Sequence, residues 1–177
     1  MINMYKNLKI VKVNNKYCNY LRKYDNKVVY NIGAKELRPF IGVLFTVNNN
    51  EYFAPLSSPK DKHKKMKNTL DLIKIKGGEY GVVNLNNMIP VNTDNYMEFD
   101  LNKKTNNELD ISRIELLTNQ LRWLTLNKKE IYTKSRVLYN LYVNNKLPKN
   151  VKDRCCNYLL LEDKCNEYNL NKEFQEV

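Results

Sequence analysis

The first half of the chain alternates short hydrophobic runs with turn residues, a pattern typical of β-strands. Residues 8–13 (LKIVKV) alternate apolar and basic side chains, which predicts a half-buried first strand. Residues 40–47 (FIGVLFTV) are almost entirely apolar and predict a central strand. Three asparagines then indicate a turn, and residues 51–56 (EYFAPL) are expected to be the hairpin partner of that strand. Two further strands are expected around the Gly-Gly pair within residues 70–91.

One helix is expected between the first strand and the central one. Residues 15–25 place Tyr17, Tyr20 and Tyr24 at helical spacing, with Asn15 available as the N-cap. Such a tyrosine stripe favours a packed helix face over a platform for stacking bases. Residues 27–37 then hold one short β-like run, KVVY, and a loop that contains a glycine.

Helical periodicity takes over after Asp110. Residues 112–115 (SRIE) have the spacing of a capping box, which predicts a helix beginning at Ser112. A second helical stretch and a third, starting near Pro148, follow. Residues 92–109 are polar and predict a long loop. Strands first and helices later predict an α+β fold, and no linker divides residues 1–177 into more than one domain.

Composition points to a polyanionic partner. The 30 Lys and Arg outnumber the 19 Asp and Glu, which gives a formal net charge of +11. A surplus of this size on one small domain favours binding to nucleic acid or to an anionic membrane surface. No broad amphipathic basic helix supports the membrane alternative.

Metal, disulfide and membrane-spanning features are not expected from the sequence. The four cysteines form no C-x-x-C pair and the chain holds one histidine, so neither a zinc site nor a disulfide framework is predicted. No apolar run approaches the length that spans a bilayer, and no signal peptide is evident. We therefore expect a cytoplasmic protein with no metal or other cofactor.

The most distinctive chemistry lies in residues 52–65, YFAPLSSPKDKHKK. A strand ends here in a turn flanked by prolines, which collects Ser57, Ser58 and Lys60. Hydroxyls, backbone amides and an ammonium group at a tight turn can hold phosphate oxygens and neutralise their charge. If the phosphate belongs to RNA, its ribose 2′-OH can attack the phosphorus while these groups stabilise the transition state. An ordinary solvated loop has the same composition, so this alternative stays open.

A second group of candidate RNA contacts surrounds that turn. Tyr and Arg side chains can stack on bases, and Lys and Arg can contact phosphates. The neighbouring lysines are expected to lower the pKa of His63. This histidine is either the single acid–base group of the site or an ordinary surface residue. The candidates are Tyr30, Lys35, Arg38, Lys62, His63, Lys64 and Lys65.

Two motifs resemble the ToxN/AbiQ family of type III toxin–antitoxin endoribonucleases. The first is A-P-L-[ST]-S-P-K, matched by residues 54–60, and the second is G-x-x-N-[LF] followed by M-I-P, matched within residues 81–90. The order of predicted elements also resembles that family over nearly the whole chain. The sequence NNMIPV and the lysine-rich tract resemble the AbiQ branch more than ToxN itself.

The resemblance implies a compact, strongly twisted antiparallel sheet with packed helices and a helical C-terminal half, related to the Kid/MazF-like toxin fold. It implies a metal-independent endoribonuclease that leaves 2′,3′-cyclic phosphate and 5′-OH ends on mRNA or phage transcripts. Its inhibitor would be a repeat-derived antitoxin RNA pseudoknot, which the toxin itself processes and which assembles with it into RNA-mediated oligomers. Abortive infection would be the biological outcome.

The resemblance also assigns residues. The catalytic hydroxyl falls on Ser57, with Ser58 beside it and Lys60 as the phosphate-binding cation. The upstream Tyr and Lys of the family correspond to Tyr30 and Lys35, with Arg38 an alternative cation. Tyr17 matches a tyrosine of the first helix and is included among the expected RNA contacts. The alternative is a basic RNA- or DNA-binding protein without catalytic activity. The serine–lysine turn distinguishes the enzyme from the binding protein, because loss of one hydroxyl there would lower the affinity of a binding protein only modestly.

Overall fold

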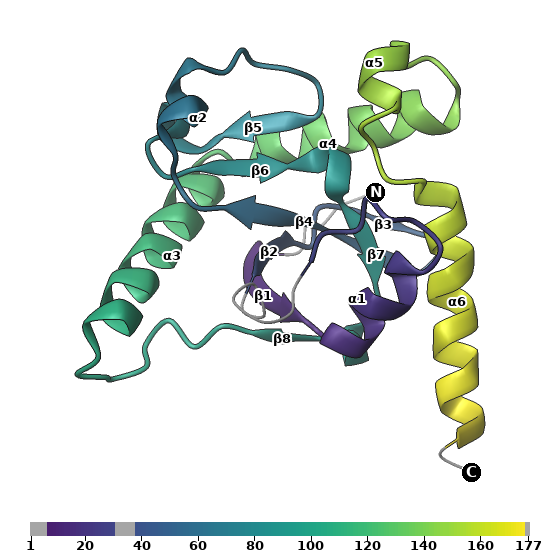
Figure 1. The fold of residues 1–177 in the computed structure, drawn as a ribbon, viewed down its shortest axis with the longest axis horizontal. Coiled ribbons are helices and arrows are strands. Elements are labelled where there is room, and N and C mark those ends of the chain that lie inside the picture. The colour runs from purple at the N-terminus through teal and green to yellow at the C-terminus, as the bar shows by residue number, and fades with distance from the viewer. Residues whose placement is uncertain (1–6, 31–37, 176–177) are drawn as a thin grey trace.

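The computed structural model describes residues 7–30 and 38–175, with side chains described up to residue 171. An eight-stranded antiparallel sheet forms the centre of the molecule, and helices flank it on either side (Figure 1). The strands are β1 (Lys9–Val13), β2 (Pro39–Gly42), β3 (Thr46–Val47), β4 (Asn50–Ser57), β5 (Leu72–Lys74), β6 (Val82–Asn84), β7 (Ile89–Val91) and β8 (Tyr96–Glu98).

The structure describes six α-helices, and the three long ones, of sixteen residues or more, all lie in the C-terminal half. They are α1 (Asn15–Arg22), α2 (Asp61–Lys65), α3 (Glu108–Leu126), α4 (Lys128–Val143), α5 (Lys149–Lys152) and α6 (Tyr158–Gln175). Figure 1 shows α3 on one side of the sheet, and α6 on the other beside α1. Tyr20 in α1 donates to the Glu167 carboxylate in α6 at 3.3 Å.

Strand β4 is the most extensively paired strand of the sheet. The main strand order is β5-β6-β4-β2-β1-β8, and β3 and β7 also pair with β4. The two asparagines Asn48 and Asn49 adopt φ of 47° and 67°, which suits the tight turn joining β3 to β4. The hairpin expected from the sequence is therefore confirmed.

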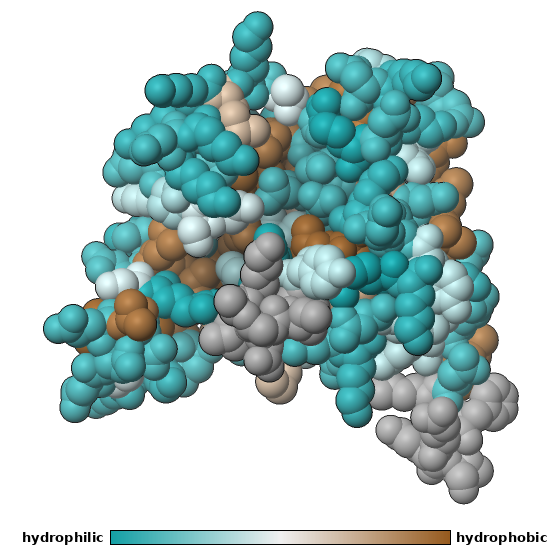
Figure 2. Space-filling model, viewed as in Figure 1, coloured by the Kyte–Doolittle hydropathy of each residue, from teal (hydrophilic) through white to brown (hydrophobic). Residues whose placement is uncertain are grey.

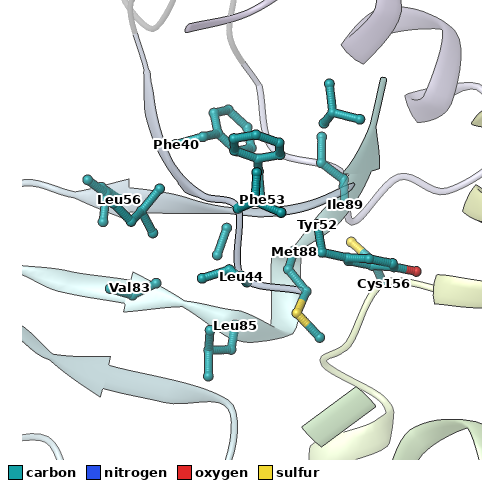
Figure 3. Packing of buried hydrophobic residues seen from close by; sticks show 14 of the residues in the cluster. Phe40, Leu44, Tyr52, Phe53, Leu56, Val83, Leu85, Met88, Ile89 and Cys156 are labelled. Atoms are coloured by element: carbon teal, nitrogen blue, oxygen red, sulfur yellow. The ribbon is translucent and has the colours of Figure 1, made fainter. Parts of the chain in front are cut away.

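The core lies on both sides of β4, whose residues are buried except for the last. Figure 3 shows Phe53 beside Phe40, whereas Tyr52 points the other way, toward Cys156. The Tyr52 hydroxyl donates to Glu162 Oε1 in α6 at 2.6 Å, and the Tyr139 hydroxyl of α4 donates to the same oxygen at 2.7 Å. These bonds satisfy polar atoms that would be costly to bury without partners.

Several expected boundaries prove different. The run predicted as one central strand is divided into β2 and β3, and KVVY forms no strand in its described residues 27–30. Residues 92–109 were expected to be a loop, but they include β8, which pairs with β1. The third helical stretch consists of two helices, α5 and α6.

Two helix starts also differ from the prediction. Helix α1 is capped by Asn14 and not Asn15, because the Asn14 Oδ1 accepts from the N–H groups of Lys16 and Tyr17. Helix α3 begins at Glu108, where Asn107 caps it, so the SRIE sequence lies inside the helix and is not its capping box. This earlier start places Arg113 within the helix that faces the serine–lysine turn.

Candidate active site

The serine–lysine turn begins where β4 ends. Ser57 is the last residue of β4, and the chain passes through Ser58 and Pro59 to Lys60, the N-cap of α2. Pro59 lacks a backbone N–H and cannot extend a ladder of strand hydrogen bonds, which helps to end the strand here. Two hydroxyls and one ammonium group therefore lie within four residues at the end of a buried strand.

Gly81 supports this turn from the neighbouring strand. It lies just before β6, which pairs with β4 through Ser57 and Val82. Its φ is +93°, and a Cβ at this position would collide with the carbonyl oxygen of Ser57. Only glycine combines this backbone conformation with so close an approach. The glycine of the second motif is therefore required to seat the turn.

Asn84, also in the second motif, contacts the Ser57 side chain directly. Its Nδ2 donates to Ser57 Oγ at 2.9 Å and to the Pro55 carbonyl oxygen at 3.3 Å. The two sequence motifs thus meet in space at the serine hydroxyl. This contact joins residues 27 positions apart in the chain.

His63 has a structural role in the same turn. Its side chain is only 3% exposed, and its Nδ1 accepts a hydrogen bond from the Lys60 backbone N–H at 3.2 Å. Burial, together with the charges of Lys62 and Lys60, lowers the pKa of the imidazole. The expectation that His63 contacts RNA or acts as the acid–base group is therefore not retained, because its side chain is buried and its acceptor nitrogen is already engaged.

A cleft of about 450 Å³ opens beside the turn. One wall comes from the end of β4 and the start of β2, and the other comes from α3. The lining residues are Arg38, Pro39, Leu56, Ser57, Ser58, Lys60, Ser112, Arg113, Leu116, Leu117 and Gln120. In the space-filling view, hydrophobic surface is visible between α3 and the sheet, with hydrophilic side chains around it (Figure 2).

The cleft is lined by cations. Arg38, Lys60 and Arg113 all contribute to its walls, and none of the described residues that line it is acidic. Burial lowers the pKa of both arginines, but a guanidinium stays charged at neutral pH. The Arg113 guanidinium also lies 5.4 Å from the centre of the Phe99 ring. Three positive charges and three serine hydroxyls, those of Ser57, Ser58 and Ser112, in a cleft with apolar walls suit a phosphodiester with attached bases.

The remaining predicted RNA contacts are distributed around this cleft. Tyr30 is 55% exposed, and its carbonyl oxygen accepts from Arg38 Nε at 2.9 Å, so the two residues are brought together. The exposed lysines Lys62, Lys64 and Lys65 lie on α2, next to Lys60. Lys35 lies outside the described residues.

Tyr17 does not belong to this surface. It is fully buried, and its hydroxyl donates to the Pro90 carbonyl oxygen at 2.6 Å. Burial also raises the pKa of this phenol well above its ordinary value. The expectation that Tyr17 contacts RNA is therefore corrected: it anchors α1 to β7.

Three residues of the site were not anticipated from the sequence: Asn84, Arg113 and Gln120. Gln120 lines the cleft and is held by a bond from its Nε2 to the Tyr80 carbonyl oxygen at 2.7 Å. Asn84 stood within a recognised motif, but nothing in its neighbours along the chain indicated its contact with Ser57. Arg113 was interpreted as part of a helix cap, and only the packing of α3 against the turn brings it into the cleft.

Across the described part of the chain, no group of three or more His, Cys, Asp or Glu side chains is arranged to hold a metal ion. None of the helices that the structure describes is both long enough and apolar enough to traverse a bilayer.

Comparison with known families supports the motif assignment. The family described as Toxin ToxN, type III toxin–antitoxin system, matches residues 9–166. Endoribonuclease ToxN of Bacillus thuringiensis subsp. kurstaki is 32% identical, over 96% of this chain and 89% of the relative. Endoribonuclease ToxN of Pectobacterium atrosepticum is 29% identical, over 96% and 98%. Endoribonuclease AbiQ of Lactococcus lactis subsp. lactis is 28% identical, over 95% and 93%. These identities do not confirm the expected closeness to AbiQ.

Solved structures show the same fold. One comes from work on selective toxin inhibition by a non-coding RNA pseudoknot; it superposes with a TM-score of 0.78 at 31% identity and covers 93% of this chain and 99% of its own. The structure of AbiQ, an anti-phage endoribonuclease of the type III toxin–antitoxin class, gives a TM-score of 0.78 at 26% identity over 93% and 99%. The predicted α+β fold, with its antiparallel sheet and C-terminal helices, is confirmed. The expected structural relationship to the Kid/MazF-like toxin fold stays a prediction.

Proposed function

The chain belongs to the ToxN family of type III toxin–antitoxin toxins and is an endoribonuclease, and we propose that it cleaves RNA without a metal ion at the turn formed by Ser57, Ser58 and Lys60. The observation that carries this proposal is the cleft itself. Ser57, Ser58 and Lys60 line it together with Arg38 and Arg113.

The chemistry follows from what these groups can do. The ribose 2′-OH loses its proton to solvent and its oxygen bonds to the adjacent phosphorus, the bond from phosphorus to the 5′ oxygen of the next nucleotide breaks, and that oxygen takes up a proton from solvent and leaves as a 5′-OH. The products are a 2′,3′-cyclic phosphate and a 5′-OH end. Negative charge grows on the phosphate oxygens in the transition state, where the Ser57 and Ser58 hydroxyls donate hydrogen bonds and Lys60 neutralises charge. A serine nucleophile is not needed, because the 2′-OH already supplies one.

The surrounding surface would bind the rest of the RNA strand. The exposed lysines of α2 (Lys62, Lys64 and Lys65) extend the positive charge away from Lys60 along the phosphate backbone. Tyr30 is exposed, and its carbonyl oxygen bonds Arg38. The Arg22 guanidinium lies 4.4 Å from the centre of the Tyr30 ring and covers one face, which leaves the other face suited to stacking on an unpaired base. We include Lys35 with these contacts on the basis of the sequence resemblance.

The inhibitor is proposed by analogy with the relatives. A non-coding RNA pseudoknot inhibits the toxin of one solved relative selectively. We propose that an antitoxin RNA of this kind occupies the same cleft, is processed by the toxin, and joins toxin copies into an RNA-mediated oligomer. The toxin would then act on mRNA or phage transcripts in abortive infection, whether or not the chain groups with AbiQ.

The test is a cleavage reaction on a mixed RNA in EDTA, with product ends mapped by enzymatic labelling. We expect cyclic phosphate and 5′-OH ends from the wild type and at least about a hundredfold slower cleavage by Ser57→Ala and Lys60→Ala. Lys146→Ala, which removes an equal charge from an exposed position between α4 and α5, is the matched control and should cleave normally. Cleavage that requires a divalent ion, or full activity in Ser57→Ala, would overturn the proposal.

A further inference from the structure

Asn84 lies behind Ser57 and not in the cleft. It is the last residue of β6, and its side-chain amide reaches across to β4, where it bonds Ser57 Oγ at 2.9 Å and the Pro55 carbonyl oxygen at 3.3 Å. Ser57 lines the cleft, whereas Asn84 is absent from its lining. Asn84 therefore touches the reacting region only through the serine.

The Pro55 carbonyl determines which way the Asn84 amide faces. A carbonyl oxygen can only accept a hydrogen bond, so the atom of Asn84 facing it must be the nitrogen and not the oxygen. The same nitrogen faces Ser57 Oγ. Both hydrogens of the amide are thus directed at acceptors on β4, which belong to residues two positions apart in the strand.

This orientation constrains the serine hydroxyl. The serine oxygen accepts from Asn84, and Asn84 presents no acceptor to it, so the serine proton must be directed elsewhere. The cleft is the side on which Ser57 is open. A hydroxyl that accepts one hydrogen bond is also polarised toward donating another.

We propose that Asn84 is a positioning residue for catalysis, which holds the Ser57 hydroxyl with its proton aimed at the phosphate. This inference rests on the proposed role of Ser57 and assigns the function of the asparagine in the second motif. The substitution Asn84→Asp reverses the arrangement without changing the size of the side chain. A carboxylate accepts the serine proton, draws it away from the cleft and repels the Pro55 carbonyl.

The test compares Asn84→Asp with Asn86→Asp in single-turnover cleavage and in binding of an RNA that carries a 2′-deoxy sugar at the cleavage site. Asn86 is two residues further along, and its Nδ2 also donates to a backbone carbonyl, that of Arg154 at 3.3 Å, away from the cleft. We expect Asn84→Asp to cleave about a hundredfold more slowly, as when one preorganised donor is lost. Its RNA affinity should fall far less than its rate, and Asn86→Asp should match the wild type in both.

A double-mutant cycle separates positioning from a general structural role. In a Ser57→Ala background, Asn84→Asp should slow the residual cleavage no further, because its effect passes through the absent hydroxyl. Asn84→Ala removes the donor without adding an acceptor and should lose less activity than Asn84→Asp. Equal losses in rate and affinity, additive effects with Ser57→Ala, or normal cleavage by Asn84→Asp would overturn the inference. If Ser57→Ala itself cleaves normally, the proposed function fails instead, so the two failures are distinguishable.

Discussion

The imidazole Nδ1 of His63 accepts a hydrogen bond from the backbone N–H of Lys60 at 3.2 Å, and the backbone N–H of His63 donates to the Lys60 carbonyl oxygen at 2.8 Å. This reciprocal pair joins the N-cap of α2 to its third residue, in the manner of a capping box. The lone histidine of the chain thus holds the residue that we propose binds phosphate.

The first prediction concerns pH and the stability of the turn. The pKa of His63 is lowered from 6.5 in the folded protein, so on acidification the unfolded chain takes up the proton first. The stabilisation is complete above about pH 6.5 and is lost as the pH falls toward the folded pKa. We expect the wild-type melting temperature to drop as the pH falls from about 7 through about 6.5, before the carboxylates titrate.

His63→Asn is the matched variant for that measurement, because its Oδ1 can accept from Lys60 but does not titrate. Its melting temperature should change less than that of the wild type over the same pH interval. Parallel curves for the two proteins would show that His63 does not contribute to the pH dependence.

The second prediction compares two glycines that both have positive φ. Gly81→Ala places a Cβ against the Ser57 carbonyl, whereas Gly77→Ala, at φ +66°, meets no atom of the described residues within 4 Å. We expect Gly77→Ala to cost about 1 kcal/mol for backbone strain. Gly81→Ala should cost at least about 2 kcal/mol, because overpacking adds to that strain.

Urea unfolding measures both costs, and cleavage assays below the unfolding transition report on the turn. Gly81→Ala should also cleave slowly while still folded, since the serine carbonyl must move. Similar unfolding free energies for the two variants would contradict the close approach of the strands.

The third prediction tests the α3 wall of the cleft. Arg113→Met keeps most of the side-chain length but removes the charge, so RNA affinity should fall for all sequences. The slope of log affinity against log salt should become shallower by about one, the change expected on losing one phosphate contact. Arg122→Met, on the exposed face of the same helix, should leave the slope unchanged. An unchanged slope in Arg113→Met would mean that α3 does not contact the RNA backbone.

The fourth prediction distinguishes anchoring from RNA binding at Tyr17. Tyr17→Phe removes the buried bond to Pro90 and should destabilise the fold by about 1 kcal/mol. Below the unfolding transition, RNA affinity and cleavage rate should match those of the wild type. A loss of affinity with no loss of stability would restore Tyr17 as an RNA contact.

The sequence was most informative where the chemistry is contiguous in the chain. Ser57, Ser58 and Lys60 are close in the sequence and lie together in the cleft. Asn84 and Arg113 could not be predicted as parts of the site, because strand pairing and helix packing bring them there from distant positions. Tyr17 and His63 had residue types suited to RNA binding, but a sequence does not show which face of a short helix is buried.

Local signals also competed with one another. The SRIE sequence has the spacing of a capping box, yet Asn107, five residues before Ser112, is the N-cap of α3 and already accepts hydrogen bonds from the N–H groups of Leu109 and Asp110. Strand β8 was missed because its three residues form an edge strand that is stabilised by pairing with β1 and carries little hydrophobic periodicity of its own.

Strand β4, which ends in Ser57, pairs with β2, β3, β6 and β7. A segment with so many partners cannot open without disrupting most of the sheet, so its local unfolding should cost nearly as much as global unfolding. Amide hydrogen exchange along β4 should accordingly be among the slowest in the protein. Inactivating the protein by moving this strand would therefore cost a large free energy. We expect an RNA inhibitor to act by obstructing the cleft, not by changing its shape.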